Sequence, residues 1–496
     1  MKYISTRDNK KSVTAAQAIL QGISVDGGLF VPEKLPQVDT AWLQSLCEKS
    51  YNERAVEVLK LFLTDFSEEQ IVNCVNNAYT AEKFDAADMV ELAKISESEY
   101  LLELWRGPTC AFKDMALQML PQLMTTAMKI TGNSDEIVIL VATSGDTGKA
   151  ALEGFKDVDG TRMLVFYPVD GVSPMQERQM ATQEGGNVKV CAIKGNFDDA
   201  QTGVKNIFGN AQLVEEMAKA GKKFSSANSI NWGRLVPQVI YYVSSYCQLL
   251  ADGEIEAGEK VNVCVPTGNF GNILAAYYAK CMGVPFAKFI CASNRNNVLT
   301  DFLRTGIYDR NRNFYATTSP SMDILISSNL ERLLHKMSGE DDATVRCWFE
   351  KLKTEGRYEV SDAVKEKLAA EFYGGCCDDA QTASTIHEVF SACSYLCDTH
   401  TAVAVKVYRD YLAETGDQTK TIIASTASPY KFANDVLKAV DESKVTADEY
   451  ENLAVLSEVS GAMIPAQLAS LKEKPVLHTD VTEKDVMAEY VRSVIL

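Results

Sequence analysis

One lysine of the chain lies where its side chain could act as a nucleophile. Residues 107–114 read Gly-Pro-Thr-Cys-Ala-Phe-Lys-Asp, and Asp114 can cap a helix that begins with the run Met-Ala-Leu-Gln-Met-Leu at 115–120. Lys113 would then lie where the chain turns into a buried helix. Burial favours the neutral amine, and a neutral amine can form a Schiff base with a carbonyl cofactor. Most lysines beside a helix start are surface residues, so this segment alone does not establish the role.

Two glycine-rich loops further along the chain could bind anions. The first, 143–148, reads Thr-Ser-Gly-Asp-Thr-Gly and follows a buried strand predicted over 137–142. The second, 266–272, reads Pro-Thr-Gly-Asn-Phe-Gly-Asn and follows a strand predicted over 261–265. Each leads into a predicted helix, whose N-terminus presents free N–H groups and the positive end of the helix dipole. One such loop can be a plain strand-to-helix turn, but two in one chain suggest two phosphate sites.

Neither loop matches a common nucleotide-binding motif. In the first, Gly148-Lys149 is followed by Ala150 instead of Ser or Thr, and residue 143 is not glycine, so the loop fails as a P-loop. The second lacks the three-glycine spacing of a dinucleotide-binding fold. A nucleotide-binding ligase or kinase is therefore disfavoured.

A third segment, 228–234, carries further anion donors. It reads Asn-Ser-Ile-Asn-Trp-Gly-Arg, and its short polar side chains and one guanidinium suit recognition of a phosphate or carboxylate. A polar loop with a partly buried tryptophan explains the same residues equally well.

The acidic composition limits the partners of the protein. A net charge of -18 over 496 residues argues against binding to nucleic acid or to an anionic membrane. Any anionic substrate must therefore be held by local donors. The four histidines and thirteen cysteines have no metal-ligand spacing, so no metal is predicted. The cysteines resemble reduced thiols, and no signal peptide or membrane span is evident, which predicts a cytoplasmic location.

The pattern of apolar segments predicts a helical N-terminal part followed by an α/β part. Residues 1–95 read mostly as helices, and from about residue 97 short apolar strands alternate with helices. Charged helical sequence over 325–398 interrupts this alternation as an insertion before the last strand. The other strands are predicted over 163–167, 188–193, 286–292 and 421–425, and helices are predicted over 41–58, 67–78 and 362–372.

Taken in order, these motifs resemble one family. Gly-Pro-Thr-x-Ala-Phe-Lys-Asp at 107–114, Ser-Gly-Asp-Thr-Gly at 144–148, Asn-Ser-Ile-Asn-Trp-x-Arg at 228–234 and Gly-Asn-Phe-Gly-Asn at 268–272 resemble threonine synthases of the long bacterial and fungal type. The likeness covers nearly the whole chain. It extends from the opening residues through 319–323 and 328–332 to 426–432.

The resemblance implies an α/β fold of the fold-type-II pyridoxal-phosphate enzymes, which is like that of the tryptophan synthase β chain. Two parallel-sheet α/β domains would accompany a mostly helical N-terminal domain. The expected boundaries are 1–95 for the N-terminal domain, 96–136 with 241–496 for the large cofactor-binding domain, and 137–240 for the smaller α/β domain.

The resemblance also assigns cofactor-binding residues. Lys113 matches the catalytic lysine that holds pyridoxal 5'-phosphate, and Thr426 matches the hydroxyl that faces the pyridine nitrogen. Asp146 falls where related enzymes often have an asparagine near the cofactor 3'-oxygen, although an aspartate would repel a phenolate there unless a proton is shared. The residues that match the cradle for the cofactor phosphate are Gly268, Asn269, Phe270, Gly271 and Asn272.

A second set matches family positions that hold the phosphate of O-phospho-L-homoserine: Ser144, Thr147, Asn228, Ser229 and Arg234. The family reaction replaces this phosphate with water and yields L-threonine. The chain departs from many relatives at Ser428, where they have histidine, and at Thr399, where proline is frequent. These departures weaken a catalytic role for Ser428 or His400, so we expect His400 to be a packed or helix-capping residue.

Two other functions stay open on the sequence. A phospho-lyase would use the same substrate but release 2-oxobutyrate, and a non-catalytic homologue would bind a metabolite without reaction. Retention of the lysine and both loops argues against the second. We expect a small-molecule substrate, no nucleic-acid or membrane partner, and a monomer or small homo-oligomer.

Overall fold

The larger of two parallel sheets carries the lysine segment at its carboxyl edge. The computed structural model describes residues 1–86, 88–143, 145–169 and 171–496. Five strands of this sheet are parallel, and only the edge strand β4 is antiparallel. Its order is β14 (Phe372–Cys376), β11 (Phe286–Ser293), β10 (Val261–Pro266), β15 (Thr421–Ser425), β5 (Glu99–Glu103) and β4 (Glu91–Lys94). The three central strands β10, β15 and β5 are buried along their whole length, as strands covered on both faces must be.

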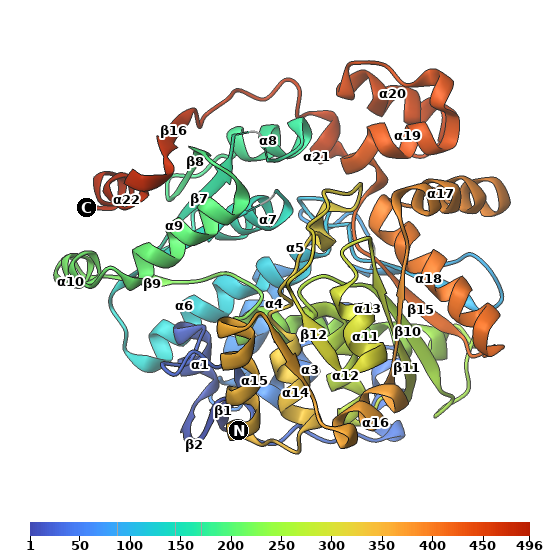
Figure 1. Ribbon diagram of the computed structural model, residues 1–496, viewed down its shortest axis with the longest axis horizontal. Helices are drawn as coiled ribbons and strands as arrows, with labels where there is room; N and C mark the ends of the chain where they lie inside the picture. The colour runs from blue at the N-terminus through green and yellow to red at the C-terminus, as the bar shows by residue number, and fades with distance from the viewer. Residues whose placement is uncertain (87, 144, 170) are drawn as a thin grey trace.

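The smaller sheet is entirely parallel and lies beside the larger one (Figure 1). Its order is β16 (Asp480–Glu483), β8 (Val188–Lys194), β7 (Thr161–Pro168), β6 (Glu136–Ala142) and β9 (Lys222–Ser225). Alternate residues of β6 face opposite ways: Val138 and Leu140 pack against one group of helices, while Ile139 and Val141 belong to the main core. The helices of this part are α7 (Asp146–Phe155), α8 (Pro174–Ala181), α9 (Phe197–Gly209), α10 (Ala211–Lys219) and α22 (Met487–Ile495).

All six strands predicted from the sequence are present, but the predicted insertion is not purely helical. Residues 325–398 include β14, which pairs with β11 at the edge of the large sheet. The short Phe-Tyr-Gly-Gly-Cys stretch lacks the apolar run that marks the other strands. The remaining elements of the insertion are α14 (Leu330–Met337), α15 (Asp342–Thr354), β13 (Arg357–Glu359), α16 (Asp362–Glu371) and α17 (Asp379–Cys393).

The N-terminal part contains a small antiparallel sheet besides its helices. The single helix predicted over 41–58 is wrong, because the first helix ends at Leu46 and Ser50 caps a second helix through a capping box with Glu53. The predicted helix over 67–78 is present with Ser67 as its cap. The elements are β1 (Tyr3–Ser5), β2 (Asp8–Val13), α1 (Ala15–Gln21), β3 (Phe30–Pro32), α2 (Thr40–Leu46), α3 (Tyr51–Phe62) and α4 (Glu68–Ala78).

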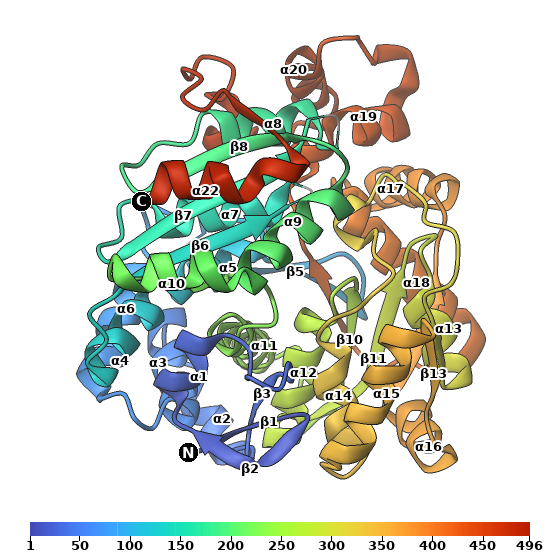
Figure 2. The ribbon, with the colours of Figure 1, turned by 60° about the vertical axis from the view of Figure 1, so that its left-hand side comes forward.

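The C-terminal segment crosses from the large sheet to the small one. After α20 and α21 it runs to β16, which pairs with β8, and α22 then lies over the small sheet (Figure 2). The range 137–240 that was predicted for the small domain therefore omits one of its strands, and the domain boundaries stay a prediction. The other C-terminal elements are α18 (Thr399–Thr415), η2 (Pro429–Phe432), α19 (Ala433–Asp441), η3 (Glu442–Lys444), α20 (Glu449–Ser460), α21 (Ala466–Ala469) and η4 (Lys484–Val486).

The remaining helices connect the strands and segments described above. They are α5 (Lys113–Leu117), α6 (Met119–Thr131), α11 (Trp232–Ala251), α12 (Gly271–Met282) and α13 (Val298–Thr305), with the short strand β12 (Ile307–Asp309) and the turn η1 (Pro320–Met322). No helix in the described part of the chain is long and apolar enough to cross a membrane. All thirteen cysteines are free thiols.

Close packing joins α5 to α7, and it requires a glycine. A Cβ atom on Gly154 of α7 would lie 2.0 Å from the carbonyl oxygen of Leu117 at the end of α5. We expect Gly154→Ala to lower the free energy of unfolding by about 1–3 kcal/mol, because the two backbones must separate. Urea denaturation measures this. Gly209→Ala is the control, since no atom lies within 4 Å of its Cβ; an equal loss there would contradict the explanation.

Candidate active site

Lys113 is the first residue of α5, and its amine lies in a buried polar cluster. Its Nζ donates to Ser321 Oγ at 3.1 Å and lies 3.4 Å from Asp146 Oδ2. Burial lowers the pKa of Lys113, and the positive charges of Lys431 and Arg234 lower it further, although Asp146 opposes them. The environment therefore favours the neutral, nucleophilic amine.

Asp114 does not cap the lysine helix as the sequence suggested. The cap position is Phe112, which has no capping side chain, and Asp114 already belongs to the first turn. Its buried carboxylate accepts instead from the backbone N of Thr109 at 2.8 Å and from its Oγ1 at 2.6 Å. Asp114 thus holds the 107–112 loop against the helix that follows it.

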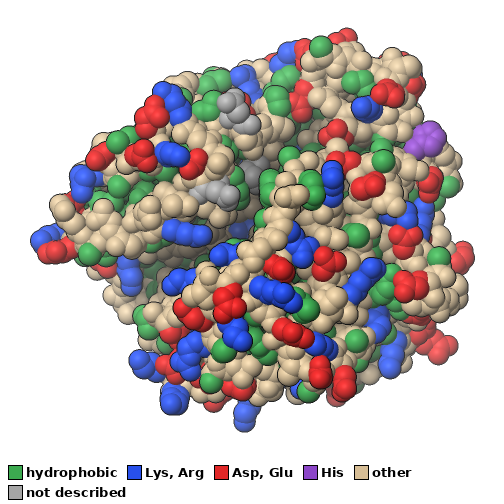
Figure 3. Space-filling model, in the orientation of Figure 1, with side chains coloured by type: hydrophobic (Ala, Val, Ile, Leu, Met, Phe, Trp, Pro, Cys, Tyr) green, Lys and Arg blue, Asp and Glu red, His purple; other side chains and the backbone are tan. Residues whose placement is uncertain are grey.

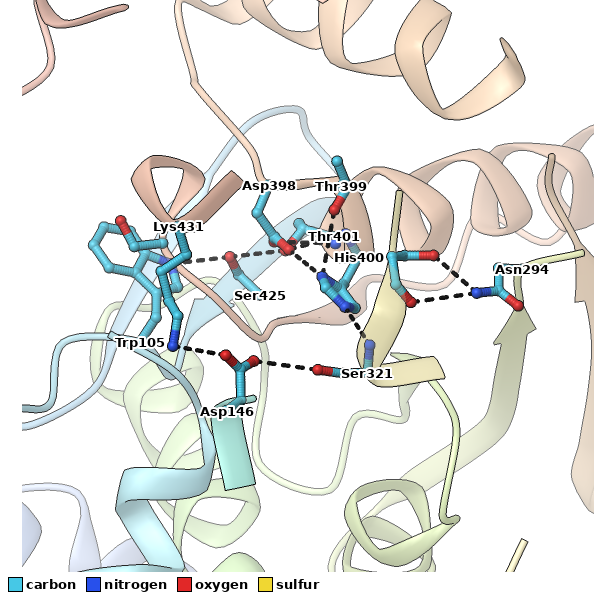
Figure 4. Close-up of polar contacts among 12 residues, drawn as sticks. Trp105, Asp146, Asn294, Ser321, Asp398, Thr399, His400, Thr401, Ser425 and Lys431 are labelled. Carbon is cyan, nitrogen blue, oxygen red and sulfur yellow. Dashed lines mark hydrogen bonds and ion pairs between the residues drawn. The ribbon is translucent and has the colours of Figure 1, made fainter. Parts of the chain in front are cut away.

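Asp146 lies at the centre of the polar cluster, in the first turn of α7 (Figure 4). Its Oδ2 accepts from Ser321 Oγ at 3.2 Å, and its Oδ1 accepts from Gln176 Nε2 at 3.1 Å and from Lys431 Nζ at 2.8 Å. Burial alone would raise the pKa of Asp146, but the ammonium groups of Lys431 and Lys113 outweigh it and hold that pKa well below its usual range. The group is therefore a buried carboxylate.

Lys431 lies in the 426–432 segment that resembles the family, but the sequence alone assigns it no role. It lies in η2, just after β15, and its side chain is fully buried. Besides Asp146, its Nζ contacts the carbonyl oxygen of Thr109 at 3.0 Å. A lysine directly after a buried central strand is the sequence signal that could have found it, because the carboxyl ends of parallel strands form ligand sites.

The second glycine loop connects β10 to α12 and has the shape of a cradle. A Cβ on Gly268 would lie 2.9 Å from the carbonyl oxygen of Ser321, so the two backbones approach closely. Phe270 adopts a left-handed conformation with φ of 63° just before α12, and its side chain packs against Phe372. Within the described residues, the buried Nδ2 of Asn272 has no hydrogen-bond partner. An orphaned donor at a helix N-terminus is suited to an anionic group that is bound there.

The third segment supplies a buried cation without a carboxylate partner. Arg234, in the first turn of α11, donates from Nη1 to the carbonyl oxygen of Ala227 at 2.8 Å. No carboxylate in the described ranges pairs with it, and burial lowers its pKa to about 10. An unpaired buried guanidinium is costly in the free protein, so its presence points to an anionic ligand.

The second loop and the third segment are joined by residues 328–329. Asn329 donates from its backbone N to the Asn269 carbonyl at 3.0 Å and from Nδ2 to the Ser229 carbonyl at 3.2 Å. Ser328 Oγ reaches Asn269 Oδ1 at 3.3 Å and Ser229 Oγ at 3.5 Å. The two anion-binding segments are therefore neighbours, as their proposed roles require.

The other predicted residues are placed less centrally. Thr147 is half-buried in the first turn of α7, and Asn228 is exposed. Thr426 is buried after β15, where its carbonyl oxygen accepts from the Phe112 backbone N at 2.8 Å. Ser144 lies outside the described residues. Figure 3 shows a hollow in this face, between the part that carries α8 and α9 and the part that carries α13 and α15, with Lys or Arg atoms in its wall.

His400 is packed, as expected, but it also supports Ser321. Asp398, not His400, caps α18, and its Oδ2 lies 2.8 Å from His400 Nδ1. The Ser321 backbone N donates to His400 Nε2 at 3.1 Å. The two ring nitrogens of His400 therefore link Asp398 to the Ser321 backbone. The His400 ring packs 4.9 Å from Phe432, so it fixes the turn that brings Ser321 to Lys113.

Comparison with known proteins identifies the same family that the sequence motifs resemble. The family described as "Threonine synthase N terminus" matches residues 2–79, and "Threonine synthase, C-terminal" matches residues 401–495. The threonine synthase of Saccharomyces cerevisiae is 35% identical over 92% of this chain and 93% of its own length. The chain belongs to the threonine synthase family.

A human protein and a bacterial crystal structure are also similar to this chain. Human "Threonine synthase-like 1" is 39% identical over 92% of this chain, which matches 63% of that protein. The crystal structure of PLP-bound threonine synthase from Brucella melitensis superposes with a TM-score of 0.88 and 36% identity, covering 99% of both chains. The predicted fold class is thereby confirmed, whereas the role of each site residue stays a prediction.

The contact between His400 and Ser321 can be tested without any ligand. We expect His400→Phe to speed amide exchange of Ser321 about fivefold, because a net hydrogen bond of about 1 kcal/mol is lost. The exchange rate is measured by hydrogen-exchange mass spectrometry on a peptide that contains residues 319–323. His387→Phe is the control, since His387 is exposed and bonds only to the Ala439 carbonyl. Unchanged exchange in His400→Phe would contradict the supporting role.

Proposed function

We propose that the protein is a pyridoxal-phosphate-dependent threonine synthase, which converts O-phospho-L-homoserine and water to L-threonine and phosphate. The observation that carries the proposal is the buried Lys113 amine, held between Ser321 and Asp146 beside two segments suited to anions. Membership of the threonine synthase family supports it. In this reaction the C–O bond at the γ carbon breaks and phosphate leaves. The β carbon loses one proton and gains the hydroxyl of water, and the γ carbon gains one proton, so that overall water takes the place of phosphate.

The residues present fit the cofactor. The unpartnered Nδ2 of Asn272 and the helix N-terminus after Phe270 would take its phosphate, and the close approach at Gly268 leaves no room for a side chain. Lys113 would hold its aldehyde carbon, and Thr426 would face its ring nitrogen. When bound, pyridoxal phosphate supplies a ring that withdraws electrons from the substrate carbons.

The chain itself would supply the proton transfers. Lys113 Nζ, whose pKa is lowered by burial, is the base that in its neutral form can take and return protons at the substrate carbons. Its hydrogen bond to Ser321 Oγ fixes the direction of the amine. Asp146 stays ionised and accepts from that same hydroxyl, so Ser321 is oriented from both sides.

The substrate phosphate needs its own donors, because negative charge builds on it as it leaves. Arg234 is the buried, unpaired cation that would bind it, together with Thr147 at the N-terminus of α7 and with Ser229 and Asn228. Exclusion of water around Arg234 strengthens this attraction. A small-molecule substrate is consistent with a set of donors that extends from the buried Arg234 to the exposed Asn228.

We also propose that the enzyme is cytoplasmic and acts as a monomer or small homo-oligomer. The thirteen free thiols support the first statement, because a reducing compartment preserves them.

Replacing the lysine tests the catalytic assignment. We expect Lys113→Ala to lose both the visible absorbance of the bound cofactor and the formation of threonine, because no other amine is assigned to bind the aldehyde carbon. Absorbance spectra and product analysis after addition of O-phospho-L-homoserine measure this. Lys11→Ala, at an exposed position, is the control.

Two results would refute the proposed function. Threonine formation by Lys113→Ala would sink the assignment of the lysine. Release of phosphate with 2-oxobutyrate by the wild-type protein would identify a phospho-lyase instead, and tight binding without any product would identify a non-catalytic homologue.

Replacing the arginine tests the phosphate site. We expect Arg234→Met to lower kcat/KM for O-phospho-L-homoserine about ten- to hundredfold, because a charge-assisted hydrogen bond contributes about 1.5–3 kcal/mol. Inhibition by inorganic phosphate should weaken in parallel. Steady-state kinetics measure both, with the exposed Arg346→Met as control. An unchanged phosphate inhibition constant would remove Arg234 from the site.

A further inference from the structure

Lys431 joins three parts of the chain that are distant in sequence. It follows β15 in the large sheet, its Nζ lies 2.8 Å from Asp146 Oδ1 at the start of α7, and it lies 3.0 Å from the Thr109 carbonyl in the loop that carries Lys113. Its side chain is fully buried. A buried ammonium persists only when it is paired and hydrogen-bonded, and Lys431 has both kinds of partner.

Asp146 consequently lies between two lysine amines. Lys431 contacts Oδ1, whereas Lys113 and the Ser321 hydroxyl contact Oδ2. The charged or titratable groups that face this pair are Asp146 from α7, Arg234 from α11, Lys431 from η2 and His400 from α18; Asp114 and Cys110 of the lysine loop face Lys431. Within the described ranges, Asp146 is the only carboxylate that pairs with Lys113.

This arrangement explains how an aspartate can occupy position 146. An aspartate near the cofactor 3'-oxygen would repel an anionic oxygen unless its charge is compensated. Lys431 supplies a compensating charge on the side of the carboxylate away from Lys113, so the Asp146 charge is already paired. The Lys113 amine is then not needed as its permanent counterion and can be deprotonated.

We propose that Lys431 is a positioning residue that holds the Asp146 carboxylate in place and thereby sets the pH at which the Lys113 amine becomes free to react. The inference rests on the proposed role of Lys113 as the cofactor-binding lysine. Lys431 itself is not assigned a contact with substrate or cofactor.

The two partners should act in opposite directions. Without the Lys431 charge, Asp146 pairs with Lys113 alone and stabilises its ammonium form, so the pKa of Lys113 rises. Without the Asp146 charge, Lys113 faces only the cations Lys431 and Arg234, so its pKa falls. A merely structural role for Lys431 would lower activity without these opposite shifts.

The test measures the reactivity of the Lys113 amine directly, in the protein freed of cofactor. Pyridoxal phosphate is added across a range of pH, the visible band of the adduct is followed in time, and borohydride trapping with mass spectrometry assigns the adduct to Lys113. We expect Lys431→Met to move the midpoint of the rate profile up by at least about one pH unit, which slows adduct formation about tenfold below the midpoint. Asp146→Asn should move it down.

Matched variants separate folding from electrostatics. Lys149→Met removes a partly buried lysine, which pairs with Glu153 and Gln183, and should leave the midpoint unchanged. If Lys431→Met does not fold, as judged by circular dichroism, Lys431→Gln removes the charge but keeps a donor for Thr109, and the same upward shift is expected.

The proposal is overturned if Lys431→Met or Lys431→Gln shares the wild-type midpoint, or if the Lys431 and Asp146 variants shift in the same direction. Failure of the proposed function looks different, because the wild-type protein itself would then trap no pyridoxal phosphate at Lys113.

Discussion

The site depends on one buried carboxylate that must be kept ionised away from water. Asp146 achieves this with two lysines, one hydroxyl and one amide as partners, none of which is close to it in sequence. Burying charged groups is favourable only if they are paired and hydrogen-bonded, because an unpaired one costs several kcal/mol. The cluster therefore demands that α5, α7, α8, η1 and η2 all be placed within ångströms of one another, and the rest of the fold serves that placement.

The two sheets meet this demand by contributing opposite sides of the cluster. Three adjacent parallel strands, β10, β15 and β5, end in the anion loop, the Lys431 turn and the lysine loop, so the large sheet provides three segments from one edge. The small sheet provides Asp146 from the end of β6. Contact of Gly154 with Leu117 then fixes α7 against α5. The distance between Lys113 and Asp146 thus depends on how closely the backbones of α5 and α7 pack.

Much of this could be read from the sequence because the signals are local. The strand predicted over 421–425 has the observed bounds, and both glycine loops were found as strand-to-helix turns. The errors arise where partners are distant. Asp114 was read as a cap, but its partner Thr109 lies before the helix. Lys431 carries no local sign that it pairs with Asp146, and β14 and β16 are edge strands too short or too polar to show an apolar run.

The pairing of β16 with β8 has a consequence for how the protein is made. Lys194 of β8 and Glu483 of β16 form an ion pair although they are 289 positions apart in the sequence. During synthesis the small sheet would therefore have an open edge for most of the time the ribosome needs for the whole chain. An open strand edge can pair with another copy of the chain, so the nascent protein is exposed to this mispairing until β16 emerges.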